Sequence, residues 1–296
     1  MSLIVASILV LMFLNLVLGS VSIPLKSVWN IICGLGDEPV TWQNIVWKSR
    51  LPQALTALVA GAGLAISGLQ MQTVFRNPLA GPSVLGISSG ASMGVAFVVL
   101  LSGSLGGVAL SKLGVMGEIA LSIAAVIGSL SVMALIVYVS QKVKGNVTLL
   151  IIGVMIGYVA NAVIGVLKFF SVEEDIRAYV IWGLGSFSRV SGNQMMLFVA
   201  IMAILIPLSF LLIKTLNLML LGDGYARNLG LNIKRARLLV ITSAGVLTAI
   251  VTAYCGPVIF LGLAVPHLCR AIFQTSDHRV LMPAVLFAGA ALALVC

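Results

Sequence analysis

Charged residues are scarce in this chain, and a polar segment long enough to form a soluble domain is absent. Only 8% of the 296 residues are Asp, Glu, Lys or Arg, whereas 60% are hydrophobic. The mean hydropathy is +1.18, which excludes a soluble catalytic domain and indicates a polytopic membrane protein. The net charge is +9, but the basic residues stand singly in loops, which suits contact with anionic lipid rather than nucleic acid.

The motifs of several enzyme classes are also missing. The sequence has no GxxxxGK[ST] loop for ATP, no HExxH or GxSxG motif and no paired carboxylates. The four cysteines show no metal-ligand spacing, and Cys255 and Cys269 lie in apolar runs, where we expect small core residues. We therefore expect no catalytic residue, no metal and no cofactor on this chain.

Ionisable residues are missing from the middle of the apolar segments. Glu118 and Lys168 stand at segment ends, where their charges can reach the membrane interface. Ion-coupled transporters usually keep ionisable groups inside the membrane, because those groups carry the coupling. The pattern disfavours secondary transport, which stays an alternative, and favours a passive pathway that another protein powers.

Nine apolar segments follow one another, and a transmembrane helix needs about 20 such residues. We expect one all-α transmembrane helical bundle over residues 1–296. With the N-terminus inside the cytoplasmic membrane, 10 of the 17 Lys and Arg residues fall on the inner side, which favours that orientation. The segments are residues 3–22, 51–73, 84–106, 119–141, 145–167, 192–213, 238–254, 257–275 and 280–296.

The second segment carries a stripe of small residues and ends at a proline. Gly61, Ala65 and Gly68 lie on one helical face, and such a stripe lets neighbouring helix backbones approach closely in lipid. We interpret the stripe as helix packing. The segment then breaks at Asn77-Pro78, and irregular backbone at membrane depth is tolerated only where protein or a water-filled cavity covers it.

Residues 220–237, which read LLGDGYARNLGLNIKRAR, form the largest basic loop on the inner side. Asp223 could cap a short helix there, and Gly230 could end it. A short helix between glycines suits docking to a soluble partner. An ordinary basic inside loop is the alternative.

The two histidines lie near turns. We expect Pro266 to break the helical pattern, and we interpret His267 as a structural hydrogen-bond partner rather than a ligand. His278 stands between Asp277 and Arg279, where a solvated loop is expected. A membrane-embedded enzyme would need convergent His, Asp or Glu side chains, so that class is disfavoured.

Two series of residues resemble the signatures of the FecCD family, the permease subunits of ABC importers for ferric siderophores, haem and vitamin B12. The first series is R-L-P, A-G-x-x-x-S-G, Q, N-P-L-A-x-P and L-G-x-x-x-G-A, from Arg50 to Ala91. The second is L-G, A-R-x-L-G-L, G-P-x-x-F-x-G-L-x-x-P-H-x-x-R and D-H-R, from Leu221 to Arg279.

The resemblance implies a ten-helix permease of the type II ABC importer kind, paired with a second permease subunit in a homodimer or heterodimer. Two cytoplasmic subunits would bind ATP and Mg²⁺, and an extracellular or periplasmic binding protein would deliver the cargo. A ferric siderophore is the leading cargo that the family implies, with haem or cobalamin as alternatives. The family pattern continues through a final helix, which we expect this chain to lack.

The resemblance also assigns roles to positions at both membrane faces. Arg50 matches an outer arginine that pairs with a glutamate of the binding protein, as the bidentate guanidinium allows. Gln53 stands where the family often has a second basic residue, so Lys48 is the expected substitute.

On the inner side, the resemblance implies a gate and a coupling loop. Asn77 and Leu79 match the cytoplasmic gate, and Asn146 and Val147 match a neighbouring gate. Within residues 220–237, the ATPase coupling loop is expected to comprise Leu221, Gly222, Asp223, Ala226, Arg227, Leu229 and Gly230.

Overall fold

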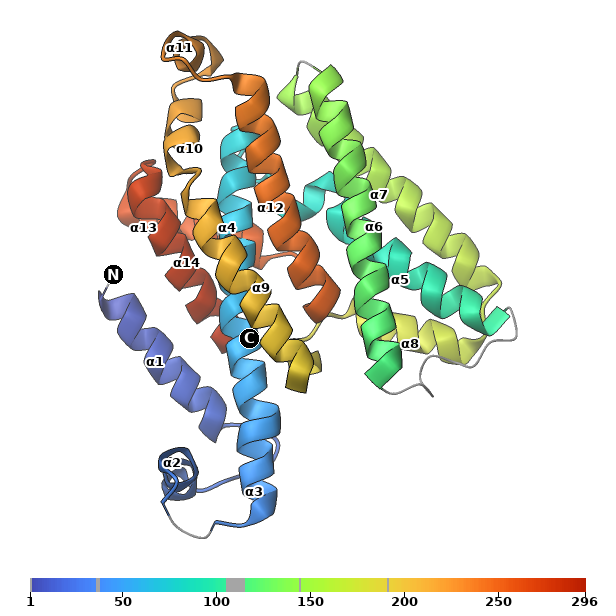
Figure 1. The fold of residues 1–296 in the computed structure, drawn as a ribbon, viewed down its shortest axis with the longest axis vertical. Helices are drawn as coiled ribbons and strands as arrows, with labels where there is room; N and C mark the ends of the chain where they lie inside the picture. Colours follow the sequence, from blue (N-terminus) through green and yellow to red (C-terminus); the bar gives the residue numbers. More distant parts are fainter. Residues whose placement is uncertain (1, 36–37, 105–114, 144, 191) are drawn as a thin grey trace.

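Helices form the fold in the part of the chain that the computed structural model describes, which is residues 2–35, 38–104, 115–143, 145–190 and 192–296 (Figure 1). In chain order they are α1 (Ser2–Val17), α2 (Leu25–Cys33), α3 (Val40–Ile45), η1 (Val46–Arg50), α4 (Leu51–Phe75), η2 (Pro82–Leu85), α5 (Ile87–Ser104), α6 (Val115–Lys142), α7 (Asn146–Phe169), α8 (Glu173–Gly183), η4 (Phe187–Arg189), α9 (Gly192–Phe210), α10 (Ile213–Leu220), α11 (Asp223–Asn228), α12 (Ile233–Cys255), α13 (Leu261–Phe273) and α14 (His278–Val295).

Helix α4 lies at the centre of the bundle. Its most apolar stretch is 83% buried, compared with 33% for α6 and 28% for α7, because α9, α12, α13 and α14 all pack against α4 (Figure 1). The helix ends at Phe75, since Arg76 adopts a left-handed conformation with φ 49° and the chain then meets Asn77-Pro78. The centre of the fold thus leads directly into the predicted gate turn.

The predicted spans differ in length from the helices that form. Among the described residues, five helices are long and apolar enough to cross a membrane, and α9 with α10 makes a sixth candidate, bent by 45°. Helices α1 and α13 are shorter than the segments predicted for them, and α5 begins later than its segment. Helix α5 starts only after the turn at Pro82, and α13 starts after Gly256-Pro257, which lie between the predicted segments 238–254 and 257–275.

Two predictions about loops and breaks are wrong. The second segment, predicted to begin at residue 51, begins earlier, because α3, η1 and α4 form one continuous 36-residue helix that starts at Val40. Pro266 does not interrupt α13, which continues through it to Phe273. At the sixth residue of α13 a proline removes one intrahelical bond, the one to the carbonyl of Gly262, and helices of membrane proteins tolerate such a loss where neighbouring helices cover the freed carbonyl.

The small-residue stripe of α4 lies against two other helices. A Cβ added to Gly289 of α14 would lie 2.5 Å from the carbonyl oxygen of Gly61 and 2.5 Å from the Cβ of Ala65. A Cβ added to Gly68 would lie 2.5 Å from the carbonyl carbon of Gly262 in α13. The backbones therefore approach too closely for any side chain at these glycines.

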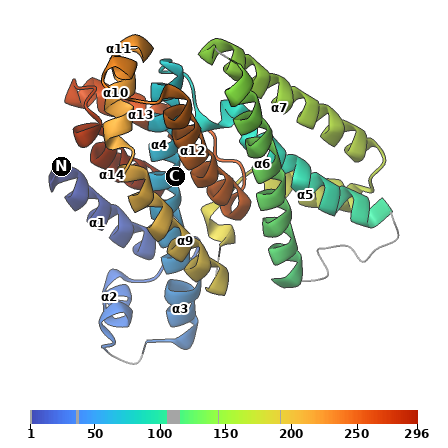
Figure 2. The same ribbon diagram turned by 45° about the horizontal axis from the view of Figure 1, so that its top comes forward.

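The elements with predicted roles lie at opposite ends of the molecule. Helix α11 lies at one end, next to the start of α12 and near the last turns of α6. Helices α2 and α3 lie at the other end, and both views agree on this arrangement (Figures 1 and 2). We call these the α11 end and the α2–α3 end.

Candidate gate, coupling and docking sites

The predicted gate turn is a short hydrogen-bonded loop at the α11 end. The side-chain oxygen of Asn77 accepts a bond of 2.9 Å from the N–H of Leu79, and its carbonyl accepts one of 3.1 Å from Ala80. This arrangement suits Asn before Pro, because the side chain replaces a backbone turn contact. Leu79 is 66% exposed, so its side chain projects from the turn.

The segment after the gate turn packs against α7, the helix that begins with the second predicted gate pair. A Cβ on Gly153 of α7 would lie 2.8 Å from the Cα of Leu85 in η2. Val147 is exposed in the first turn of α7. Asn146 begins the helix, and its side chain lies outside the described residues. The two loops are therefore connected through η2 and α7.

The predicted coupling loop contains a short helix with exposed side chains. Helix α11 follows Gly222, which has φ 99°, and ends in a Schellman motif: the N–H of Gly230 (φ 83°) bonds to Arg227 and that of Leu231 to Ala226. Ala226 faces inward and is fully buried, whereas Tyr225 is 73% exposed. Leu221, Arg227 and Leu229 are also exposed.

The prediction that Asp223 caps α11 is wrong. Its side chain accepts no hydrogen bond from the first turn of the helix. Its carboxylate instead forms an ion pair of 2.6 Å with Arg76, and Arg237 of α12 lies 3.9 Å away on the other oxygen. Arg76 immediately precedes Asn77. A single carboxylate thus connects α11 to the gate turn and to α12.

Arg50 is expected from the resemblance to pair with the binding protein. In the structure it is buried, and only 6% of its surface is accessible. Its guanidinium donates bonds of 2.8 Å to the carbonyls of Leu16 and Val17 and a further bond to Val21. The last carbonyls of a helix lack intrahelical donors, and Arg50 supplies donors at the end of α1. Lys48, by contrast, is exposed.

A buried polar cluster joins α4, α10 and α14, and sequence reasoning missed it. His278, expected in a solvated loop, is fully buried. Its Nε2 lies 2.8 Å from the hydroxyl of Thr73, and the side-chain oxygen of Asn217 accepts bonds of 2.9 Å from its N–H and 2.7 Å from Nδ1. Asn217 also donates a 2.6 Å bond to Asp277. These partners hold α10 beside the end of α4.

Asp277 caps the first turn of α14 beside this cluster. It accepts a 2.9 Å bond from the N–H of Arg279, and this bond and the amide of Asn217 hold the pKa of its carboxyl below the usual value. Nearby, the side-chain amide of Gln72 donates a hydrogen bond of 3.1 Å to the carbonyl of Leu263, and its oxygen accepts a hydrogen bond from Arg270. His267 is exposed.

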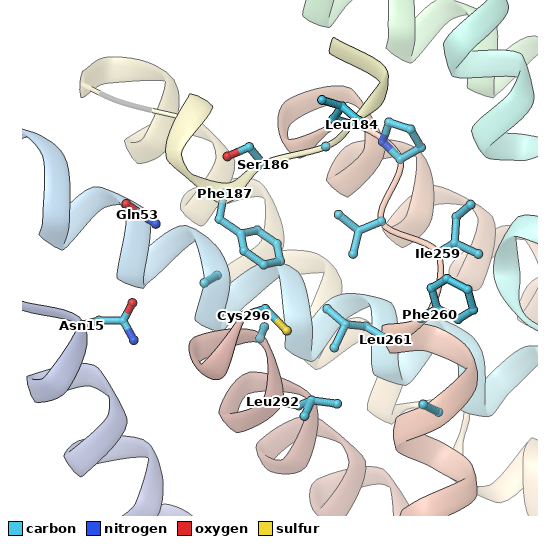
Figure 3. A pocket seen from close by; sticks show the side chains of 16 residues that line it. Asn15, Gln53, Leu184, Ser186, Phe187, Ile259, Phe260, Leu261, Leu292 and Cys296 are labelled. Carbon is cyan, nitrogen blue, oxygen red and sulfur yellow. The ribbon is translucent and has the colours of Figure 1, made fainter. Parts of the chain in front are cut away.

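A cavity of about 600 Å³ lies on the side of α4 that faces α13 and α14. Figure 3 shows Asn15 and Gln53, from α1 and α4, on one side of the space and Phe260 and Leu261 on the other. Its walls are mainly apolar. Such a surface can accept a large ligand without holding it through many hydrogen bonds.

Chemically, these features do not resemble an active site. Among the described residues, no group of three or more His, Cys, Asp or Glu side chains could hold a metal ion. Cys255 and Cys269 are buried, as predicted for small core residues. What the fold presents instead is an apolar cavity, a proline-containing turn and a projecting helix that an ion pair connects to that turn.

Long apolar helices around a central span define a polytopic membrane protein, and the apolar cavity, the gate turn and the projecting helix fit a transport permease. The chain belongs to the FecCD transport family, whose family model matches residues 7–296.

Two curated relatives and one solved structure support this assignment. The vitamin B12 import system permease protein BtuC of Klebsiella pneumoniae is 36% identical over 249 residues, which cover 84% of this chain and 71% of that protein. The hemin transport system permease protein HmuU of Yersinia pestis is 34% identical, covering 94% and 79%. A structure described as an inward-facing conformation of a metal-chelate type ABC transporter aligns with a TM-score of 0.82 and 27% identity, over 99% of this chain and 87% of that one.

Proposed function

We propose that this chain is the permease subunit of an ATP-driven importer that carries a metal chelate across the cytoplasmic membrane. The observation that carries the proposal is the connection between a projecting helix and the gate turn. Helix α11 exposes Tyr225 and Arg227 for a partner, and Asp223 in its first turn pairs at 2.6 Å with Arg76, next to Asn77.

The same connection suggests how ATP hydrolysis on another subunit would act. An ATPase that displaces α11 would move Asp223, and the ion pair would transmit that displacement to Arg76. Arg76 also bonds to the carbonyl of Met219 at 3.4 Å, so α10 would move with it. Asn77 and Leu79, with Asn146 and Val147, would then open or close the inner mouth of the pathway.

The cargo is proposed as a ferric siderophore, with haem and cobalamin as the competing cargoes. The relatives carry the names of vitamin B12 and haemin permeases, and both of those molecules are metal chelates. A cavity of about 600 Å³ with mainly apolar walls suits passage of a large ligand, because weak contacts do not retain it. Selectivity would then lie on the binding protein.

The assembly we propose contains two ATPase subunits at the α11 end and a binding protein at the α2–α3 end. Lys48, which is exposed, is the first docking candidate there, with Arg50 available only after it leaves its three carbonyls. A second permease subunit would cover the apolar face of α7, where Tyr158 is 65% and Phe169 82% exposed. The N-terminus would lie inside the cell.

The uptake assay tests the proposal directly. The permease is reconstituted in proteoliposomes with its ATPase and binding protein, and ferric siderophores, haem and cobalamin are offered with and without internal ATP. We expect ATP-dependent uptake of one cargo. Uptake that ignores ATP but collapses when an ion gradient is dissipated would overturn the proposal in favour of secondary transport.

The coupling role of α11 has its own test. Arg227→Glu reverses a charge on the projecting face, and we expect it to abolish cargo-dependent stimulation of ATP hydrolysis. Lys214→Glu is the matched control, because Lys214 is exposed on α10 outside the proposed contact. Equal stimulation in wild type and Arg227→Glu would remove Arg227 from the coupling surface.

A further inference from the structure

A second cavity, of about 250 Å³, lies at the α11 end between the last turn of α6, helix α11 and the first turns of α12. Four cationic side chains from these three helices line it: Lys142, Arg227, Lys234 and Arg237. The cavity is too small for a cobalamin-sized cargo, since sites for drug-sized ligands take about 300–1,000 Å³. It also shares no lining residue with the cavity of about 600 Å³ described above.

The charges in this cavity are unbalanced. Its only carboxylate among the described lining residues is Asp223, and that group already pairs with Arg76 at 2.6 Å, while Arg237 lies at 3.9 Å. Within the described part of the chain, Lys142, Arg227 and Lys234 have no salt-bridge partner. The ammonium group of Lys142 lies 4.7 Å above the ring of Tyr138, and this aromatic contact carries no negative charge that would balance it.

Arg237 supplies an independent indication that the cavity is an anion site. The residue is only 9% exposed, and its Nε is buried with no hydrogen-bond partner in the structure. A buried donor without an acceptor costs about 1–3 kcal/mol, and more when it is charged. An oxyanion in the cavity would accept from Nε, and the start of α12 would favour the negative charge further.

The position of the cavity indicates where such an anion comes from. Helices α6 and α12 are candidate membrane spans, and the end of Met116–Lys142 and the start of Ile233–Cys255 both lie at the α11 end (Figure 2). Residues of both helix ends line the cavity. Span ends lie at the level of the lipid headgroups, and basic pockets between helices at that level suit phosphate. We propose that this cavity binds the phosphate of an anionic phospholipid headgroup, beside the proposed coupling helix.

The proposal is tested on the purified full chain by native mass spectrometry. Phosphatidylglycerol and phosphatidylcholine are titrated separately, and inorganic phosphate is added as a competitor. We expect Lys234→Gln to weaken phosphatidylglycerol binding about fivefold, as expected for one lysine near the headgroups. The matched control is Arg235→Gln, which removes a charge one residue away at an exposed position outside the cavity.

Four outcomes distinguish the possibilities. Selective weakening by Lys234→Gln, repeated by Lys142→Gln from the opposite wall, supports the site. Equal weakening by Arg235→Gln would show general surface attraction and overturn it. Displacement of the lipid by millimolar inorganic phosphate would assign the cavity to a soluble anion instead. Unchanged lipid binding in both cavity variants would overturn the proposal, whatever the uptake assay shows. The cations would then pair with an acidic side chain of a partner protein.

Discussion

Replacing Gly68 by Ala should destabilise the protein more than a methyl group added at Gly61, the other glycine of the α4 stripe, because all three atoms nearest to the new Cβ are backbone atoms of Gly262 and the overlap is deeper. The new Cβ would overlap the carbonyl oxygen of Gly262 and lie 2.5 Å from its carbon and 2.9 Å from its Cα. Carbon atoms in contact are about 3.5–4.0 Å apart, so α4 and α13 must separate by about 1 Å. A rotamer change cannot relieve this contact, since both partners are main chain.

The cost can be worked out from three contributions. Overpacking costs about 1–3 kcal/mol. Separation of the helices also stretches the 3.1 Å bond from Gln72 to Leu263, one residue beyond Gly262, and a hydrogen bond contributes about 0.5–1.5 kcal/mol. Ala gains about 0.5–1 kcal/mol over Gly in a helix. The net loss in the free energy of unfolding is about 2 kcal/mol.

Gly183→Ala is the matched control, since Gly183 is exposed in the last turn of α8 and a Cβ there meets no atom within 4 Å. It should be neutral or should stabilise by about 0.5–1 kcal/mol. The assay is thermal unfolding of both purified variants in the same detergent, where about 2–4 °C is expected per kcal/mol. A Gly68→Ala midpoint equal to wild type, or below-wild-type melting of Gly183→Ala alone, would refute the packing argument.

Three further predictions concern charged groups. Asp223→Arg or Arg76→Asp alone should lower coupled transport. Either change should alter the free energy of unfolding by less than about 1 kcal/mol, because the ion pair is exposed. The double exchange should restore transport, and failure to do so would argue against transmission through the pair. Arg50→Gln should lower the melting midpoint by removing donors from buried carbonyls, whereas Lys48→Glu should leave melting unchanged and weaken binding-protein affinity. Burial and neighbouring Glu174 raise the pKa of Asp175 above its usual 3.8, so the native state holds this proton to higher pH than the unfolded state does, and stability falls as pH rises from 3.8 through the raised pKa. Asp175→Asn should therefore melt at a higher temperature than wild type at pH 7. A difference in melting temperature between variant and wild type that is the same at pH 4 and pH 7 would contradict this assignment.

The apolar segments of the sequence were sufficient to locate most of the helices. Helix length was predicted less well, because Gly and Pro positions rather than hydropathy decide where α5 and α13 begin. The helical part before residue 51 was missed, since its mixed polar and aromatic residues lack a continuous apolar run. The boundary between the predicted segments 238–254 and 257–275 was located correctly, because Gly256 and Pro257 end the helix through local effects.

The candidate sites divide in the same way. The turn at Asn77-Pro78 and the end of α11 at Gly230 depend on nearby residues, so local patterns predicted their position. His278 was placed wrongly because its partner Thr73 is 205 residues away and its immediate neighbours are charged. Asp223 reaches Arg76 across 147 residues. Pairings at such separations depend on the packing of the whole bundle, which a single sequence does not reveal.

The contact between α4 and α14 limits how this permease can change shape. A methyl group at Gly289 would lie 2.5 Å from the carbonyl oxygen of Gly61 and 2.5 Å from the Cβ of Ala65, so only a glycine fits at this contact. Sliding of α14 along α4 by a helical turn, about 5.4 Å, would bring a residue with a side chain into that place. We therefore expect α4 and α14 to move together, and any alternation of the pathway to use rotations at other interfaces, such as those of α6 and α7.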